Sequence, residues 1–431
     1  MATALDPHAA IVRKAGGAPA MLTTADGRPL ARALARSSAR SRRRAFLLVA
    51  PLLLFVVVTF VIPIGQMLHR SMYNDGFAAN MPQISAWFAE NPPGTQPDET
   101  AFAALTADLT AAAEARTIGI VGTRMNYDVP GTRSLFTSTG RQARGGFEPP
   151  YREALTEVDP RWQDPTLWRA MRSASTAYTA NFYLAAMDLT RNDQNEIVSV
   201  PERQQVYGML FMRTFWLSLL ITGLTFVLGF PIAHLLATLP TRKSNLLMIL
   251  VLLPFWTSLL VRTTAWMVLL QQQGVVNDIL VWLGMIGQDG RLQMIYNRTG
   301  TIIAMTHILL PFMILPLYSV MRTINPSYVR AARSLGATSW TAFRRVYFPQ
   351  TLPGLGAGAL LVFILAVGYY ITPALVGGSS GQLISNMIAM HMTETLNWSM
   401  AAALAALLLA GVLILYWVYD RMVGIDNLKL G

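Results

Sequence analysis

The sequence predicts an all-α integral membrane protein with six transmembrane helices and a mainly helical insertion after the first of them. Of the 431 residues, 53% are hydrophobic and only 13% are charged, whereas a typical soluble domain has about 25% charged residues. Six apolar stretches are each long enough to cross about 30 Å of hydrocarbon, which takes roughly 20 helical residues. We place these spans at 46–68, 209–237, 246–270, 301–321, 355–375 and 400–419.

The first apolar stretch, 46–68, contains no charged residue. A soluble core helix of that length would carry a polar stripe, so the stretch indicates a membrane span. It starts too late in the chain and runs too long for a signal peptide, which we therefore do not expect. The preceding segment, 1–45, is rich in Ala, Arg and Ser. We expect it to be a disordered basic tail whose arginines contact anionic membrane lipid.

Residues 69–206 separate the first two spans and are numerous enough to form a domain. Apolar and aromatic side chains recur in this segment at helical spacing: Phe102, Leu105, Leu109, Trp168, Met171, Ala174, Tyr178 and Phe182. We therefore expect a mainly helical insertion outside the membrane. Two interpretations of it stay open, a structural cap and a docking platform for an external partner.

The distribution of Lys and Arg predicts the orientation, because cytoplasmic loops carry an excess of basic residues. Segment 1–45 has nine basic and two acidic residues, and the link 322–353 has five arginines and no acidic residue. The insertion 69–206 has twelve arginines against sixteen acidic residues. Both ends, 1–45 and 421–431, are therefore predicted to be cytoplasmic. The basic excess then reflects topology, and we expect no nucleic acid partner.

No catalytic or metal site is predicted. The only lysines are Lys14, Lys243 and Lys429, and none follows a glycine as a Walker A loop requires. The chain has no cysteine, and its five histidines form no H-E-x-x-H motif. Gly377–Gly381 matches G-x-S-x-G but lacks the strand before it that a nucleophile elbow needs. Gly354–Gly358 is a G-x-x-x-G spacing that indicates close helix packing at the start of the fifth span.

The link between the fourth and fifth spans, within 325–350, predicts a helix–turn–helix on the cytoplasmic side. Either Asn325 or Ser327 caps a first helix, and Gly336 ends it in a left-handed conformation. Either Thr338 or Ser339 caps a second short helix, whose side chains toward the membrane domain are predicted to be Trp340, Phe343, Val346 and Tyr347. A cationic element with small residues at its turn fits a groove on a partner.

Two prolines are expected to close this second helix before the fifth span, namely Pro349 and Pro353. The whole link resembles the EAA coupling loop of ABC importer permeases, whose pattern is E-A-A, three residues, Gly, nine residues and I-x-L-P. The coupling-loop residues that this resemblance assigns are Arg330, Ala331, Ala332, Gly336, Ala337, Phe343 and Pro349. Arg330 replaces the usual glutamate.

The resemblance extends beyond the link. Leu253–Trp266, His307–Tyr318 and Gly368–Gly378 are similar to segments of spermidine/putrescine permeases. The resemblance covers the first span and 207–420, and it implies a type I importer permease fold in the bacterial inner membrane. The partners that it implies are cytoplasmic ATPase subunits, a second permease subunit and a periplasmic solute-binding protein. ATP is then used by the partner subunits, so this chain binds no cofactor and is not an enzyme.

The candidate substrate pathway combines aromatic side chains with one charge inside a span. Aromatic faces attract polycations, although such residues also anchor helices at membrane interfaces; the candidates are Trp256, Trp266, Tyr369 and Tyr370. Arg262 lies inside the third span, where a charge is costly and functional by default. We expect Arg262 to pair with Asp278 or Glu394, or to face an anionic group.

Because of Arg262, an amino-acid-like or opine-like substrate with a carboxylate stays open beside a polyamine. Two alternatives from other classes are a stand-alone secondary transporter or channel, and a membrane receptor whose insertion is the working domain. Secondary transporters favour paired inverted repeats, and the sequence contains no clear internal repeat.

Overall fold

The computed structural model describes residues 30–192, 194 and 196–423 and divides into two compact units, Met1–Gln66 and Met67–Gly431. The first unit contains α1 (Leu30–Val56), the π-helical turn η1 (Val57–Val61) and the start of α2 (Ile62–Met72). Its apolar part belongs to a continuous helix, Ser41–Met72, that is long and apolar enough to cross a membrane, as predicted for 46–68.

The helix of the first span begins earlier than predicted. The chain is already helical from Leu30, so the prediction of a disordered tail is wrong for residues 30–45. That segment is rich in Ala, Leu and Arg, which are among the strongest helix formers. The rest of the predicted tail, 1–29, lies outside the described residues, as does most of the predicted C-terminal tail.

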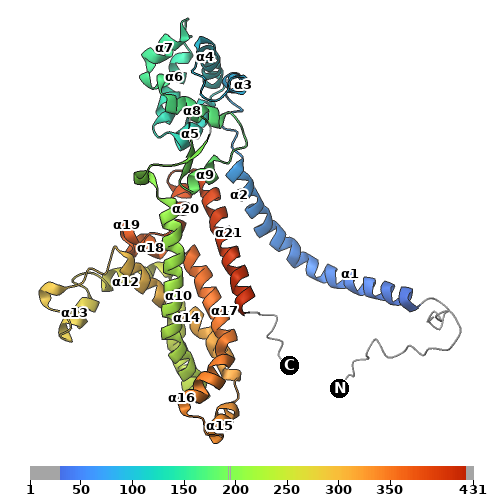
Figure 1. Cartoon of the computed structure of the whole chain (residues 1–431), viewed down its shortest axis with the longest axis vertical. Coiled ribbons are helices and arrows are strands. Elements are labelled where there is room, and N and C mark those ends of the chain that lie inside the picture. The colour runs from blue at the N-terminus through green and yellow to red at the C-terminus, as the bar shows by residue number, and fades with distance from the viewer. Residues whose placement is uncertain (1–29, 193, 195, 424–431) are drawn as a thin grey trace. The chain divides into compact units, whose positions relative to one another are not determined.

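The insertion domain, residues 73–206, is mainly helical, as predicted (Figure 1). Its helices are α3 (Pro82–Glu90), α4 (Glu99–Glu114), α5 (Ile118–Asp128), α6 (Thr132–Ala143), α7 (Tyr151–Val158), α8 (Pro165–Ala174) and α9 (Asn181–Ala186). Two short turns, η2 (Pro160–Gln163) and η3 (Glu202–Gln204), complete the helical part. A small antiparallel hairpin pairs β1 (Leu189–Arg191) with β2 (Ile197–Ser199), with Leu189 opposite Ser199.

The predicted helical spacing accounts for the core of the insertion domain. Phe102, Leu105 and Leu109 on α4 are buried against α8 and its neighbours. Trp168 on α8 is also buried, and its ring packs edge-on against Phe102 with 5.0 Å between centroids. The series does not continue to Tyr178, because α8 ends at Ala174 and Tyr178 is 65% exposed.

The membrane region begins with α10 (Tyr207–Thr238). It continues through α11 (Thr241–Leu252), η4 (Leu253–Trp256), α12 (Leu259–Leu269), α13 (Val275–Trp282), η5 (Gln288–Gly290) and α14 (Arg298–Thr323). It ends with α15 (Pro326–Ser334), α16 (Ser339–Ala342), η6 (Phe343–Tyr347), α17 (Phe348–Gly368), α18 (Ile371–Val376), α19 (Gly378–Gly381), α20 (Ile384–Thr393) and α21 (Trp398–Val423). Among the described residues, five helices are long and apolar enough to cross a membrane, and a bent pair brings the number to six.

Two of the predicted spans differ from continuous helices. The third, predicted at 246–270, is bent by 96° between Trp256 and Leu259. The fifth, predicted at 355–375, ends at Gly368 and restarts as the short α18. Apolar composition locates a span but does not reveal a break that neighbouring side chains stabilise.

Helices α10, α14 and α17 share one buried core, to which Leu217, Met313 and Val362 contribute. A Cβ atom at Gly354 would lie 2.9 Å from the carbonyl oxygen of Pro316, and one at Gly358 would lie 2.9 Å from the sulfur of Met313. The glycines therefore allow α17 to approach α14 closely, which confirms the packing predicted from the G-x-x-x-G spacing.

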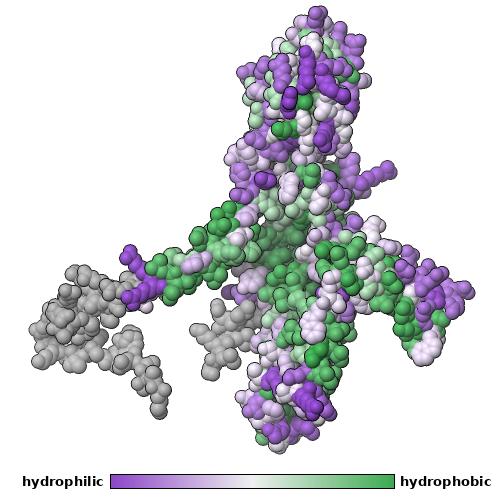
Figure 2. Space-filling view, turned by 180° about the vertical axis from the view of Figure 1, so that it is seen from behind, coloured by the Kyte–Doolittle hydropathy of each residue, from purple (hydrophilic) through white to green (hydrophobic). Residues whose placement is uncertain are grey.

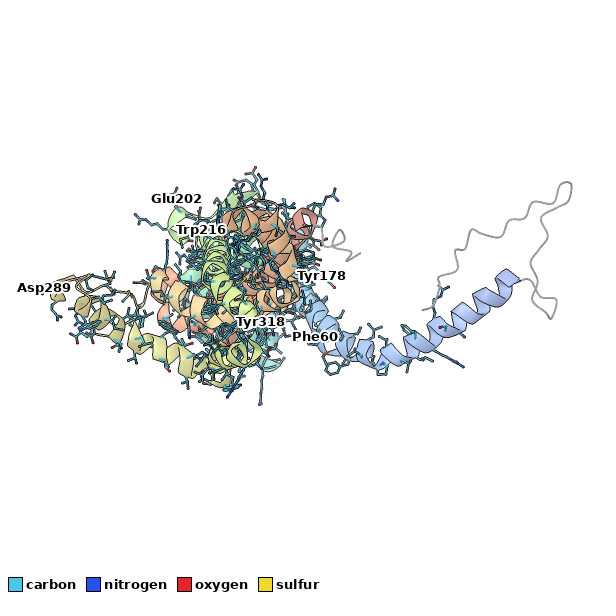
Figure 3. All side chains as sticks on the ribbon, turned by 90° about the horizontal axis from the view of Figure 1, so that it is seen from below. Phe60, Tyr178, Glu202, Trp216, Asp289 and Tyr318 are labelled. Atoms are coloured by element: carbon cyan, nitrogen blue, oxygen red, sulfur yellow. The ribbon has the colours of Figure 1, made fainter. Side chains whose placement is uncertain are left out.

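The surface changes character along this unit. Hydrophobic residues cover the long helices, and hydrophilic residues gather over the insertion domain (Figure 2). Large apolar side chains on α10 point outward, and Trp216 is one of them with 62% of its surface exposed (Figure 3). Such a surface is expected where lipid replaces water.

The insertion domain is joined to the first helix of the membrane region by Asp188. The carboxylate of Asp188 accepts N–H groups of Val206 (3.0 Å), Tyr207 (3.1 Å) and Gly208 (2.7 Å). Val206 is the N-cap residue of α10, and its side chain makes no capping hydrogen bond. Asp188 therefore satisfies orphan donors at the start of α10 and places a negative charge at the positive end of its dipole.

Asp188→Ala is expected to destabilise the protein by about 1–2 kcal/mol, the usual cost of a lost N-cap. Asp188→Asn keeps one acceptor oxygen and is expected to lose less stability than Asp188→Ala. The measurement is the thermal unfolding midpoint in detergent, with Asp289→Ala on the exposed turn η5 as the control. A midpoint for Asp188→Ala equal to that of the control would contradict this role.

Candidate functional site

The first candidate site is the predicted coupling loop, residues 325–350, called the coupling loop below. Asn325 is the N-cap of α15, and its side-chain oxygen accepts the N–H of Ser327 at 2.9 Å. Gly336 has φ +91°. Its N–H donates to the carbonyl of Arg333, and the N–H of Ala337 donates to that of Ala332. These are the two bonds of a Schellman motif, so Gly336 ends α15 as predicted.

The second half of the loop differs from the prediction. Thr338 is the N-cap, accepting the N–H of Thr341 at 3.2 Å. The helix then runs without interruption from Ser339 to Gly368, so Pro349 and Pro353 do not end it. Pro349 follows the π-helical turn η6 at the start of α17. A π turn changes the hydrogen-bond register, so a proline without an N–H is accommodated there.

Aromatic side chains attach the second half of the loop to α10. Phe343 packs edge-on against Phe230 at 6.0 Å, and the hydroxyl of Tyr347 lies 3.0 Å from Nδ1 of His234. Phe343 and Tyr347 therefore face the membrane domain, as predicted. Trp340 was predicted to do the same, but it is 67% exposed and stacks on the outer side of Phe343.

The turn itself is an exposed projection. Leu335 is 89% exposed, and a Cβ atom at Gly336 would meet nothing within 4 Å. Arg330, Ala331 and Pro349 are exposed, whereas Ala332 and Ala337 are half-buried. An apolar tip flanked by guanidinium groups can insert into a groove that combines apolar and acidic surface.

The second candidate site surrounds the break between η4 and α12. Ser258 caps α12 by accepting the N–H of Val261 at 3.1 Å. One guanidinium nitrogen of Arg262 donates to the carbonyl of Thr257 at 3.2 Å. The hydroxyls of Thr263 and Thr372 lie 3.1 Å apart and join α12 to α18. Irregular backbone is tolerated in a membrane only where it is buried in protein or lines a cavity.

Three of the predicted pathway residues gather near this break, together with one residue that the sequence analysis missed. The indole N–H of Trp266 donates to Nδ1 of His307 at 3.1 Å. Arg262 lies close enough to His307 and Tyr369 to interact electrostatically with both. A histidine inside an apolar span is itself a signal for function, and this signal could have identified His307.

The second break, at Tyr369 and Tyr370, is stabilised by α20. Ser385 donates its hydroxyl to the carbonyl of Tyr369 at 2.6 Å, and Asn386 donates its amide to the carbonyl of Tyr370 at 2.8 Å. The carbonyl of Tyr369 has no backbone donor four residues later, because Pro373 lacks an N–H, so Ser385 supplies one. The carbonyl of Tyr370 also accepts the N–H of Ala374 at 3.0 Å. The backbone at the end of α17 is therefore held in place beside Arg262, Trp266 and His307, which together with Tyr369 are called the Arg262 cluster below.

The expected pairing of Arg262 with Asp278 was wrong. Asp278 pairs with Arg291 at 2.8 Å, so it does not pair with Arg262. No carboxylate of the described residues forms an ion pair with Arg262, and its Nε is buried without a hydrogen-bond partner. Trp256 and Tyr370 are 73% and 46% exposed, and their place in a substrate pathway stays a prediction.

Comparisons of this chain with known proteins agree on one family. Residues 208–423 match the family described as binding-protein-dependent transport system inner membrane component. The spermidine/putrescine transport system permease protein PotB of Escherichia coli is 34% identical over 220 residues, covering 50% of this chain and 79% of that protein. PotB of Haemophilus influenzae is 32% identical over 254 residues, covering 57% of this chain and 88% of that protein.

Among solved structures, a bacterial ABC transporter that imports the acidic polysaccharide alginate aligns with a TM-score of 0.40 at 19% identity. This alignment covers 51% of the present chain and 79% of the other. The insertion domain lies outside the family match, which begins at residue 208.

Arg262→Leu is expected to reduce uptake severalfold. A charge at mid-membrane costs about 3 kcal/mol of insertion free energy. Because Arg262 makes insertion less favourable, we expect it to have a role in transport. Arg262→Lys keeps the charge and is expected to keep most of the uptake. The measurement compares uptake with the amount of protein in the membrane. Normal uptake of polyamines and amino acids by Arg262→Leu would show that Arg262 has no role in the pathway.

Proposed function

This chain belongs to the family of binding-protein-dependent transport system inner membrane components, and from that premise we propose that it imports polyamines of the spermidine and putrescine type. It is the membrane-spanning permease subunit of an ABC importer and not an enzyme. The names of its PotB relatives support the substrate. ATP is bound and hydrolysed by separate cytoplasmic subunits, and this chain itself holds no cofactor.

The observation that carries the proposal is the exposed coupling loop. Its tip, Leu335 and Gly336, is open to a partner, while Phe343 and Tyr347 attach its second half to α10. The ATPase subunits receive the tip in a groove. Their closure moves the loop, and the continuous helix from Ser339 to Gly368 carries this movement to the break at Tyr369.

The Arg262 cluster is the gate that this movement changes. A pathway has to bind its substrate weakly enough to release it. Trp266 and Tyr369 offer aromatic faces to a polyamine, while the positive charge of Arg262 opposes tight binding of a polycation. Selection of the substrate therefore rests with the periplasmic binding protein, and a second permease subunit completes the pathway.

A second candidate substrate is an amino-acid-like or opine-like solute. It is favoured by the absence of a carboxylate partner for Arg262 among the described residues and by its buried, unpaired Nε. A substrate carboxylate would satisfy that nitrogen with a charge-assisted hydrogen bond. Competition for uptake between putrescine and acidic amino acids separates the two candidates.

We expect both termini in the cytoplasm and the insertion domain in the periplasm. The basic excess of the links predicts this orientation. A reporter active only in the cytoplasm is expected to be inactive when fused at Gly94 and active when fused after Leu430. An active reporter at Gly94 would place the coupling loop on the wrong side for an ATPase and would contradict the proposed function.

Gly336→Val is expected to abolish most association with the ATPase while the subunit still accumulates in the membrane. The positive φ of Gly336 costs a residue with a side chain about 1–2 kcal/mol, which is small for a whole membrane domain. The larger effect is steric, because the added side chain would occupy the space needed by the groove.

The matched control is Gly284→Val. Gly284 also has a positive φ, +68°, and also has open space around its Cβ position, but it lies between α13 and η5, away from the coupling loop. The measurement compares membrane levels, co-purified ATPase and uptake. Equal ATPase binding by both variants would remove the main support for the coupling loop.

A further inference from the structure

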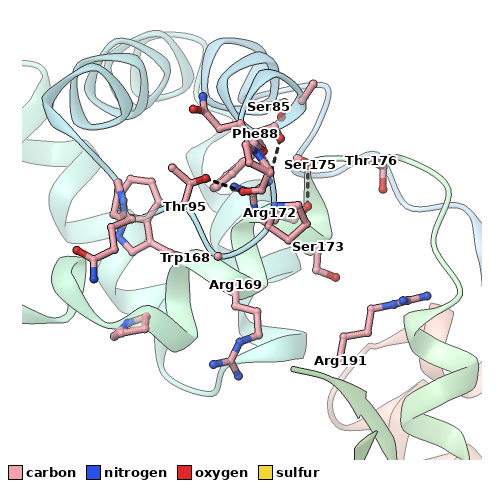
Figure 4. A pocket seen from close by; sticks show the side chains of 18 of the residues that line it. Ser85, Phe88, Thr95, Trp168, Arg169, Arg172, Ser173, Ser175, Thr176 and Arg191 are labelled. Carbon is pink, nitrogen blue, oxygen red and sulfur yellow. Dashed lines mark hydrogen bonds between the residues drawn. The ribbon is translucent and has the colours of Figure 1, made fainter. Parts of the chain in front are cut away.

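Arginine side chains are used in two different ways in the half of the protein that contains the insertion domain. Inside that domain, α8 and the loop 91–97 line a groove of about 1150 Å³ (Figure 4). There Arg172 donates to the carbonyl of Phe88 at 3.0 Å and to that of Asn91 at 2.7 Å, and its guanidinium lies 4.9 Å from the ring centre of Phe88. Arg172 therefore holds the wall of the groove. Two arginines at the start of α10 and α14 are placed differently.

This arginine pair, Arg213 and Arg298, converges on the turn formed by α19. One terminal nitrogen of Arg213, on α10, donates to the carbonyl of Ser379 at 3.1 Å and to that of Gln382 at 3.4 Å. The Nε atom of Arg298, the first residue of α14, donates to the carbonyl of Ser380 at 3.1 Å. Neighbouring carbonyl groups thus bring together two guanidinium groups from distant segments.

The glycine-rich segment Gly377–Gly381, which has no part in the proposed function, explains how this turn is formed. It lies so close to the start of α14 that a Cβ atom at Gly381 would be 2.9 Å from the carbonyl oxygen of Asn297. The hydroxyl of Thr301 donates to the carbonyl of Gly381 at 3.2 Å. The turn is therefore fixed against α14, and its carbonyl groups hold the arginine pair in position.

The charges of the arginine pair are not balanced by acidic side chains. No carboxylate among the described residues forms an ion pair with Arg213 or Arg298, and the two charges lie close enough to repel each other. Arg298 is exposed, and its terminal nitrogens form no hydrogen bond within the described part of the chain. An anion bound there would offset the repulsion through charge-assisted hydrogen bonds.

The arginine pair lies at the edge of the membrane region. Arg298 begins α14, which is long and apolar enough to cross a membrane, and Arg213 lies in the second turn of α10. Beside Arg213, α10 carries the exposed apolar side chains of Met212, Trp216 and Leu219, whose spacing places them on one face. Cations at the level where a span begins, next to an apolar face, match the phosphate and the acyl chains of a phospholipid.

We propose that Arg213 and Arg298 bind the phosphate group of an anionic phospholipid in the leaflet on the side of the insertion domain. An acyl chain of this lipid lies along the face formed by Met212, Trp216 and Leu219. Arginine suits phosphate because its planar guanidinium group donates two parallel hydrogen bonds. Two cations without acidic partners favour a lipid of net negative charge over a zwitterionic one. The inference does not depend on the solute that the chain transports.

Lipid binding at this site can affect the second break. The N–H of Ile384 donates at 2.8 Å to the hydroxyl of Thr214, the neighbour of Arg213. The next two residues, Ser385 and Asn386, bind the carbonyl groups at the break. A phosphate that fixes the turn of α19 between α10 and α14 therefore also fixes the start of α20, from which the break is held.

The test measures the thermal unfolding midpoint of the full chain in detergent micelles that contain increasing mole fractions of phosphatidylglycerol. The lipid is expected to raise the midpoint of the wild type, because a ligand that binds only the folded state stabilises it. The mole fraction that gives half of this rise is expected to increase about tenfold for Arg298→Gln, as for the loss of one charge-assisted hydrogen bond. Arg298→Lys keeps the charge and should bind more tightly than Arg298→Gln.

The matched control is Arg141→Gln, which removes the same charge at an exposed position on α6 and should respond to the lipid as the wild type does. Without lipid, Arg298→Gln should unfold at the same temperature as this control. Equal lipid responses of the two variants would overturn the proposal. An equal response of the wild type to phosphatidylcholine, which is zwitterionic, would also overturn it.

Two further outcomes would assign the arginine pair to another ligand and overturn the proposal. If inorganic phosphate raises the midpoint of the wild type as much as phosphatidylglycerol does, and Arg298→Gln removes both effects, the site binds a free anion. If Arg298→Gln loses the co-purified second permease subunit while its lipid response equals that of Arg141→Gln, the pair belongs to a subunit interface. Neither outcome would affect the importer function.

Discussion

The structure depends on one constraint, that every backbone N–H and C=O group inside a membrane has to find a partner within the protein. Long helices meet it by themselves, but this chain breaks two of its spans. At the first break Ser258 caps α12. At the second, Ser385 binds the freed carbonyl of Tyr369, and Asn386 adds a donor to the carbonyl of Tyr370. Because the partners at the second break come from α20, that break can exist only in the assembled fold, whereas Ser258 caps the helix that it precedes. The polar chemistry of the membrane region is concentrated where these breaks meet.

This arrangement connects the two ends of the transporter. At one end the coupling loop joins α10 through Phe343 and Tyr347, and α17 continues from the loop to the second break. At the other end Asp188 binds the first N–H groups of α10. The 32 residues of α10 extend about 48 Å at 1.5 Å per residue. Helix α10 therefore contacts both the insertion domain and the loop 325–350.

Much of this could be predicted from sequence, because it depends on local patterns. Apolar runs located the spans, and the Asn325 and Gly336 signals defined α15, since caps act within a few residues. The rest depends on contacts between distant segments. Pro373 is a local signal for the break at Tyr369, because it has no N–H for the carbonyl of Tyr369, but the donor that replaces it, Ser385, comes from a distant segment. Trp340 was expected to face inward, but it is 67% exposed and stacks on the outer side of Phe343. Asp278 pairs with Arg291, because the fold of the chain around α13 brings these two residues together.

The central claim, that this chain imports polyamines by using ATP hydrolysed in a partner, is tested most directly by uptake into proteoliposomes. The vesicles contain the chain with its second permease and ATPase subunits, and labelled putrescine or spermidine is supplied with the binding protein on one side and ATP on the other. Uptake is expected only when the chain, ATP and the binding protein are all present. Uptake of polyamine without ATP, or ATP-driven uptake of another solute with no uptake of polyamine, would contradict the account.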